Sequence, residues 1–173
     1  MRSARFTLAG TSMPRTALIV VTPEAEPAVG ALRLEHDWSA PLGVPAHVTI
    51  LFPFAAVAEI DEEAIAEVVA GFPAFDFELD RVGRFEGGPV WLHPEPSEPF
   101  TALTAAVWHR FPDYPPYEGA HDTVVPHLTV SYEPIDVDIK LPIRARAHAV
   151  TLIEEAADGR WSVRRVFPLQ GVA

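Results

Sequence analysis

VPAHVTILFPF, residues 44–54, holds the pattern that decides the fold, a His-x-Thr triplet inside an apolar run. A second triplet, His127-Leu128-Thr129, lies in the run VVPHLTVSY, residues 124–132. The β-branched and aliphatic residues of both runs predict buried strands. Because side chains alternate between the two faces of a strand, the His and Thr of each triplet share one face, and Val48 and Leu128 point to the other. Each copy therefore places an imidazole beside a hydroxyl on one surface of a sheet.

The two triplets form a weak internal repeat. Each His and Thr of the second lies 80 positions after its counterpart in the first (127 against 47, 129 against 49). The sequence passes through a predicted helix shortly before each motif strand. Either triplet alone is typical of a core histidine beside a common strand residue. Two copies in the same Pro-flanked apolar frame favour two related lobes that share one site.

The remaining apolar patterns predict a mixed fold in the order β-α-β-α-β-β-α-β-β-β. Thr22 before Pro23 is a good helix cap, Asp61 begins another helix, and Asp158-Gly159 marks a hairpin turn. Without regular βαβ alternation, this order indicates the α+β class. We expect strands over residues 16–22, 47–52, 75–82, 90–93, 127–132, 144–154 and 160–169, and helices over 23–36, 60–72 and 100–111.

Composition narrows the classes of function. The chain has 173 residues, 13 Lys and Arg against 24 Asp and Glu, and a formal net charge of −11, so long duplex nucleic acid is an unexpected partner. No cysteine is present, which excludes disulfides, thiol nucleophiles and Cys-based metal sites. No apolar run approaches the roughly 18 residues of a membrane span. We expect a cytoplasmic monomer with a loose N-terminal extension, residues 1–12, before a single domain, residues 13–173.

Two histidines beside one phosphate can break a phosphodiester without a metal. One imidazole takes a proton from the nucleophile and the other gives one to the leaving oxygen, since the unperturbed pKa of imidazole lies near neutrality. In-line displacement needs the rings on opposite sides of the phosphorus, which two facing strands can arrange. A Thr hydroxyl beside each His can donate to a non-bridging oxygen. The triplets thus predict a symmetric phosphate site whose histidines titrate as a coupled pair, with either one as the acid.

On these two motifs the chain resembles the 2H phosphoesterase superfamily, and within it the bacterial 2′-5′ RNA ligase (LigT-like) proteins. The resemblance extends from about Arg15 to near the end of the chain. It implies two pseudo-symmetric lobes of mostly antiparallel sheet, with outer helices and a central cleft. It also implies action on 2′,3′-cyclic phosphates or 2′-5′ phosphodiesters of nucleotide or RNA-like substrates, with no metal and no cofactor. By the same resemblance His47 and His127 are the acid–base pair, and Thr49 and Thr129 bind the phosphate.

One departure bears on the substrate. Several members of the superfamily carry Arg or Lys shortly after the second motif, whereas Ser131, Tyr132 and Glu133 follow it here. A smaller or less charged substrate than RNA fits this change. A cation could also come from the strand residues Arg144, Arg146, Arg164 or Arg165, although solvated strand faces explain them equally well.

Three aromatic residues are candidates for the rim of the cleft: Trp91, Tyr117 and Tyr132. Trp91 could stack a base, although core packing is the commoner role of such a residue. A second function also fits the cleft, a non-catalytic module that binds a small phosphate-bearing ligand. Metal ligation by the histidines is disfavoured because no further ligands stand at metal spacing.

Overall fold

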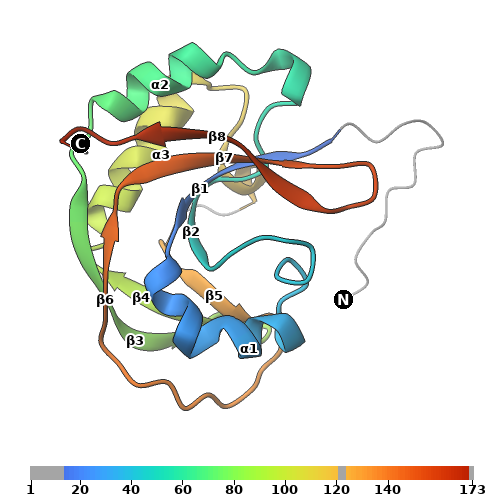
Figure 1. The fold of residues 1–173 in the computed structure, drawn as a ribbon, viewed down its shortest axis with the longest axis vertical. Helices are drawn as coiled ribbons and strands as arrows, with labels where there is room; N and C mark the ends of the chain where they lie inside the picture. The colour runs from blue at the N-terminus through green and yellow to red at the C-terminus, as the bar shows by residue number, and fades with distance from the viewer. Residues whose placement is uncertain (1–13, 121–123, 172–173) are drawn as a thin grey trace.

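A computed structural model describes residues 14–120 and 124–171. Eight strands form a single antiparallel sheet in the order β6-β3-β4-β5-β2-β1-β7-β8 (Figure 1). The strands are β1 (Thr16–Val21), β2 (His47–Leu51), β3 (Phe75–Arg84), β4 (Val90–Glu95), β5 (Leu128–Ser131), β6 (Ile143–Ala147), β7 (Ala149–Glu155) and β8 (Trp161–Pro168).

The sheet divides into two matching halves at the β2–β5 pair. In one half Ile19 of β1 lies opposite Thr49 of β2, and in the other Trp91 of β4 lies opposite Thr129 of β5. Each pairing has a register shift immediately beside this pair of residues. The repeat detected in the motifs therefore extends to strand pairing and to the position of a bulge. The α+β class and the two pseudo-symmetric lobes are confirmed, each lobe being four strands of one continuous sheet.

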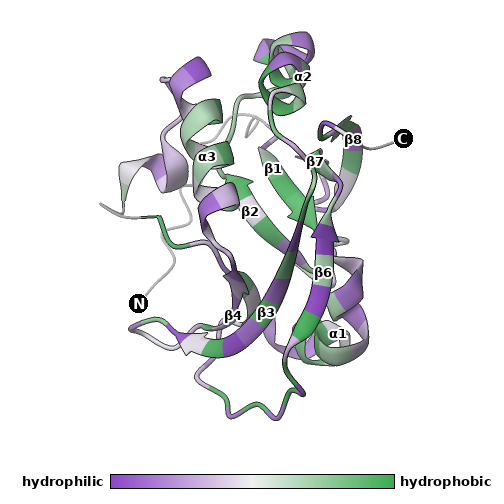
Figure 2. Ribbon diagram, turned by 90° about the vertical axis from the view of Figure 1, so that its left-hand side faces the viewer, coloured by the Kyte–Doolittle hydropathy of each residue, from purple (hydrophilic) through white to green (hydrophobic). Residues whose placement is uncertain are grey.

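Three helices cover one face of the sheet: α1 (Glu26–His36), α2 (Glu62–Ala70) and α3 (Glu98–Arg110). The middle residues of both triplets, Val48 and Leu128, are fully buried in the core with apolar side chains of all three helices. Figure 2 shows β1 and β2 as largely apolar, and β3 and β6 as alternating between apolar and polar residues. Because side chains alternate, burial of Val48 and Leu128 under the helices turns the His and Thr of each triplet to the opposite face.

The structure corrects two local predictions. Thr22 does not cap a helix: its hydroxyl donates to the Val20 carbonyl at 3.3 Å, and a short 3-10 turn, Pro23–Ala25, precedes α1. The predicted strand 144–154 is two strands, β6 and β7, separated by His148. Because β6 pairs with β3 and β7 pairs with β1, the chain crosses from one half of the sheet to the other at this residue. The sheet must therefore curl strongly.

The other predicted elements are present with small changes of boundary. Asp61 caps α2 as expected, since its carboxylate accepts a hydrogen bond from the Ala64 amide at 3.0 Å. The predicted extension, residues 1–12, lies outside the described residues. No helix among the described residues is long and apolar enough to cross a membrane.

Candidate active site

The two triplets meet at the centre of the sheet, on adjacent strands. Val48 of β2 lies opposite Leu128 of β5 in an antiparallel pair. Antiparallel pairing then places His47 opposite Thr129 and Thr49 opposite His127. The local two-fold axis passes between Val48 and Leu128. The strands are thus side by side, not facing each other, and the sheet itself brings both histidines to one surface.

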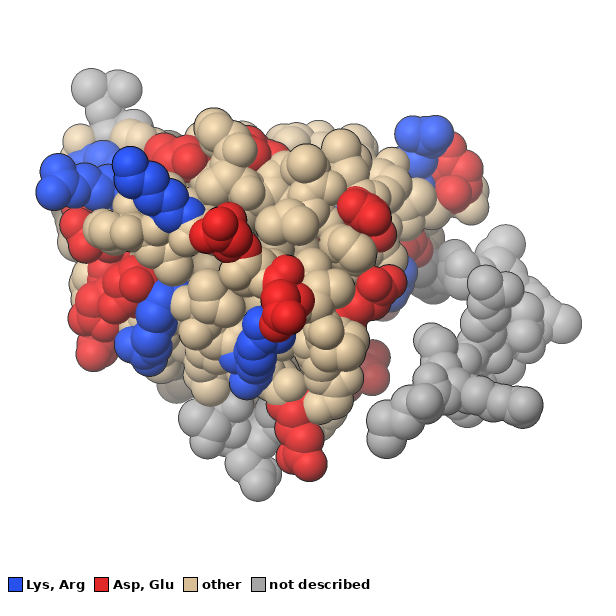
Figure 3. All heavy atoms as spheres, turned by 90° about the horizontal axis from the view of Figure 1, so that it is seen from below, with Lys and Arg blue, Asp and Glu red and all other residues tan. Residues whose placement is uncertain are grey.

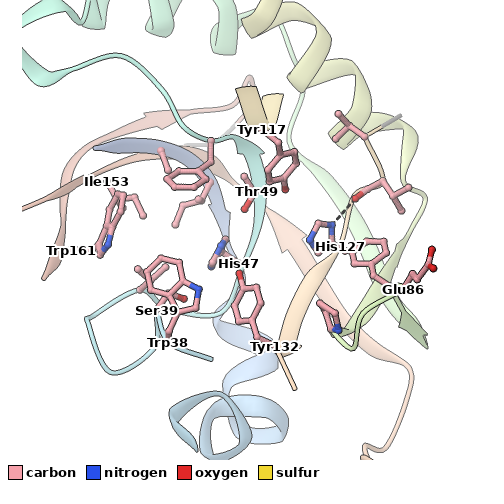
Figure 4. Close-up of a pocket in the computed structure, with 18 residues that line it drawn as sticks. Trp38, Ser39, His47, Thr49, Glu86, Tyr117, His127, Tyr132, Ile153 and Trp161 are labelled. Carbon is pink, nitrogen blue, oxygen red and sulfur yellow. Dashed lines mark hydrogen bonds between the residues drawn. The ribbon is translucent and has the colours of Figure 1, made fainter. Parts of the chain in front are cut away.

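Both imidazole rings are held in the same way. Nδ1 of His47 lies 2.7 Å from the carbonyl oxygen of Pro45. Nδ1 of His127 lies 2.6 Å from the carbonyl oxygen of Val125, a bond drawn as a dashed line in Figure 4. A carbonyl can only accept, so Nδ1 carries the proton in each neutral ring and Nε2 carries the lone pair. Each bond goes to the residue two positions earlier, and both rings line one cavity.

His47 is neutral near pH 7. Burial lowers its pKa from 6.5 to about 4, because desolvation penalises the charged ring. The bond to Pro45 opposes this shift, and the nearby positive charge of Arg33 adds to it. A neutral imidazole with its lone pair on Nε2 can accept a proton in its resting form.

Two tyrosines repeat the symmetry. The Tyr117 hydroxyl lies beside Thr49 and the Tyr132 hydroxyl lies beside Thr129, and each threonine acts to lower the pKa of its tyrosine. Burial raises the pKa of Tyr117 to about 12 and also raises that of Tyr132, so both phenols keep their protons. Each threonine of the motifs therefore has a neutral phenol beside it. Both tyrosines and Thr49 line the cavity, whereas Thr129, the other predicted phosphate ligand, does not.

Tyr117 is held by an unusual backbone. Its φ is +52° and that of Glu118 is +55°, a left-handed conformation that non-glycine residues rarely adopt. The Tyr117 amide donates to the Phe52 carbonyl at 2.7 Å, which ties this turn to the end of the first motif run. Backbone strain of this kind persists only where surrounding contacts enforce it, and it is common at functional sites.

A buried ion pair supports the loop beside His47. Arg33 and Asp37 are both about 2% exposed, and Arg33 Nη2 lies 3.1 Å from Asp37 Oδ2. Nη2 also donates to the Val44 carbonyl at 3.1 Å. The second carboxylate oxygen of Asp37 accepts from the Ser39 amide at 2.9 Å and from the Ser39 hydroxyl at 2.7 Å. This network fixes the segment between α1 and β2.

The cavity at the triplets has a volume of about 570 Å³, and its two ends differ in chemistry. Figure 4 shows Trp161 and Ile153 at one end and His127 and Glu86 at the other, with His47 and Thr49 between them. The apolar end is formed by Ala17, Ile19, Val44, Phe52, Ile153 and Trp161. Among the described residues that line this cavity, none is Lys or Arg, and Glu86 is the sole charged acid.

Comparisons with known proteins agree with this geometry. A family model described as the 2′-5′ RNA ligase superfamily matches residues 21–170. The chain belongs to this superfamily. The resemblance to the 2H phosphoesterases is thereby confirmed. A sequence search of curated proteins finds no match.

Solved structures share the fold of this superfamily member at low sequence identity. E. coli LigT complexed with 3′-AMP has a TM-score of 0.66 and 18% identity, over 90% of this chain and 97% of that one. A protein of Thermus thermophilus has a TM-score of 0.64 and 19% identity, over 92% and 100%. A protein described as a phosphoesterase has a TM-score of 0.61 and 17% identity, over 90% and 98%. Other E. coli LigT structures hold NADP+, ATP and phosphate.

Trp91 is not on the rim of the cavity. Its side chain is 8% exposed and does not line the cavity. The indole stacks on Phe85 at a centroid distance of 4.9 Å and lies 6.0 Å from the His127 ring. Gly83 makes room for it, since a Cβ at that position would overlap the indole. Trp91 therefore supports His127 from beneath.

The arginines considered as phosphate ligands lie elsewhere on the superfamily member. None of them lines the cavity. All four form ion pairs with carboxylates: Arg144 with Glu78, Arg146 with Asp76, Arg164 with Glu62 and Glu154, and Arg165 with Glu63. Figure 3 shows acidic and basic side chains interspersed on one face of the molecule, without a basic patch on the part that is described. These arginines are therefore structural, solvated residues.

One group of described residues could hold a metal ion: Asp80, His93 and Glu95 on β3 and β4. His93 Nδ1 lies 2.8 Å from Asp80 Oδ1, so the imidazole already has a partner. None of the three lines the cavity at the triplets.

Sequence reasoning missed the residues that hold the loop over the cavity. Arg33 and Asp37 stand four positions apart at the end of a predicted helix, which is a recognisable spacing for an ion pair. Their burial, however, depends on the contacts of α1 with β5, which connect distant parts of the chain.

Proposed function

We propose that the protein is a metal-independent phosphoesterase that opens 2′,3′-cyclic phosphates of nucleotide-like substrates by histidine acid–base catalysis. The observation that carries this proposal is the symmetric arrangement of the two triplets around the Val48–Leu128 pair. Both histidines hold the Nδ1–H tautomer through the carbonyl two residues earlier and line one cavity. A structural role for either histidine does not require this duplication.

The roles of the two histidines follow from their surroundings. The lowered pKa of His47 favours this residue as the general base, because its ring is neutral near pH 7. Water then attacks phosphorus, a new P–O bond forms, and the water proton passes to Nε2 of His47. The bond from phosphorus to one ribose oxygen breaks, and that oxygen takes the Nε2 proton of His127. The product is a phosphate monoester, and solvent restores both rings.

The aromatic rings beside His127 support its role as the acid. Phe85 lies 4.9 Å and Trp91 lies 6.0 Å from the imidazole, both at steep interplanar angles. A positive charge within about 6 Å of an aromatic face is attracted by the ring quadrupole. These ring contacts suit the imidazolium form of His127, which donates the proton.

Three hydroxyls of the cavity can hold the charge of the transition state. Thr49, Tyr117 and Tyr132 line the cavity, and both tyrosines remain neutral, whereas Thr129 stands beside Tyr132 without lining the cavity. A neutral hydroxyl can donate a hydrogen bond to a non-bridging oxygen of the phosphate. Neutral donors in place of Lys or Arg suit a single small phosphate.

Turnover of a 2′,3′-cyclic nucleotide in EDTA tests the proposal. We expect the wild-type protein to open the ring, and His47→Ala and His127→Ala each to lose about 100-fold to 10,000-fold in rate, the usual share of general acid–base catalysis. His109→Ala, an exposed residue of α3, is the matched control and should keep full activity. Full activity in both cavity variants would refute the assignment.

A binding module is the second candidate, because no Lys or Arg is found among the described residues lining the cavity. Such a protein would hold a small phosphate-bearing ligand without turning it over. Binding of a cyclic nucleotide with no product after long incubation would favour this function over catalysis.

A further inference from the structure

Trp38 is a large aromatic residue that the fold leaves half in solvent. Its side chain is 47% exposed, and it lines the cavity of the two triplets. A tryptophan that serves the core is normally well buried, since it can remove 150–250 Å² from water. The exposed indole at this cavity therefore contributes little to the stability of the fold.

The segment that carries Trp38 is rigid. Its neighbours Asp37 and Ser39 are 2% and 6% exposed, and both belong to the buried network of Arg33. The indole also packs beside the ring of Tyr132. An exposed ring that is held between buried neighbours and beside a second ring is ordered before any ligand arrives, which reduces the entropy lost on binding.

The position of the ring connects it to the phosphate site. Tyr132, which packs beside Trp38, also lies beside Thr129 of the second triplet. The two aromatic rings lie 6.3 Å apart with an interplanar angle of 34°. Figure 4 shows both near His47, on the side of the cavity opposite Tyr117. Trp38 and the histidines of both triplets therefore line the same cavity, where one small ligand can contact the indole and the imidazoles.

We propose that Trp38 is a stacking platform for the base of the substrate, which makes the substrate a nucleoside phosphate and not a small alkyl cyclic phosphate. This inference rests on the phosphate site proposed above. Bases stack on aromatic side chains irrespective of their sequence, because every base has a π-face. The scarcity of charged residues among the described lining suits a neutral, planar group, and about 570 Å³ falls within the usual range of small-ligand cavities.

Equilibrium binding of two phosphate monoesters tests the platform without relying on turnover. The probes are 3′-AMP, which has a base, and glycerol 2-phosphate, which lacks one. Stacking is worth about 1–3 kcal/mol per base, so Trp38→Ala should weaken the affinity for 3′-AMP about 5-fold to 150-fold. The same substitution should change the affinity for glycerol 2-phosphate by no more than about 2-fold. Trp38→Phe keeps an aromatic face and should bind 3′-AMP better than Trp38→Leu, which keeps only apolar area.

Trp108→Ala is the matched control, because Trp108 is similarly exposed, at 45%, but lies on α3 and does not line the cavity. It should change neither affinity. If Trp38→Ala weakens the binding of both probes equally, the residue acts only through Tyr132 and the platform is refuted. The platform is also refuted if Trp38→Ala weakens the binding of neither probe, or if the wild type does not bind 3′-AMP. Failure of cyclic-nucleotide turnover, with the binding pattern intact, would overturn the catalytic proposal alone.

Discussion

The neutral His47 makes folding stability depend on pH in a defined direction. Its pKa is about 4 in the folded protein and 6.5 as an unperturbed group, so between these values the unfolded chain binds more protons. The contribution of His47 to the free energy of unfolding is therefore fully present above pH 6.5 and is lost as the pH falls towards 4. From the two values, the loss is about 2 kcal/mol at pH 5 and approaches about 3 kcal/mol at lower pH.

Urea denaturation of the wild type and of His47→Gln, each at pH 7 and pH 5, measures this loss. The glutamine side chain does not titrate, so the variant should lose about 2 kcal/mol less than the wild type between the two pH values. His109→Gln, changed at an exposed position, should follow the wild type. Equal losses in the wild type and His47→Gln would refute the buried neutral state and, with it, the reason for making His47 the base.

Three further predictions concern the residues around the cavity. Asp37→Ala leaves Arg33 buried without its carboxylate and should lower the free energy of unfolding by about 3–5 kcal/mol, measured in urea. Tyr117→Phe removes the hydroxyl beside Thr49 and should reduce kcat about 2-fold to 10-fold, equivalent to about 0.5–1.5 kcal/mol, with the fold unchanged by circular dichroism. Gly83→Ala should cost about 1–3 kcal/mol in thermal unfolding, because the new methyl group meets the Trp91 ring; unchanged stability would contradict that packing.

Local patterns were sufficient to predict the two-lobed α+β fold and a common site for the two triplets, but not that their strands are neighbours in one sheet. Strand alternation alone puts His47 and Thr49 on one face, and the Asp61 cap is a property of a few adjacent residues. The break of the predicted strand at His148 was not predictable in this way, because it depends on which distant strand each half joins.

The surroundings of the triplets required the three-dimensional arrangement. The sequence alone does not distinguish Trp91 from Trp38. In the structure Trp91 is buried beneath His127, whereas Trp38 is exposed at the cavity. The space for Trp91 comes from Gly83 on another strand, and the exposure of Trp38 comes from the buried anchors Asp37 and Ser39. Packing between distant segments decides both outcomes.

The central claim is that the two triplets form one site acting on one phosphate. The kinetics of His47→Ala, His127→Ala and the double variant on a 2′,3′-cyclic nucleotide test it most directly, because residues that act as a unit are strongly non-additive. We expect the double variant to be about as slow as the slower single variant. Losses that multiply in the double variant would mean that the histidines act independently, and would contradict the single symmetric site.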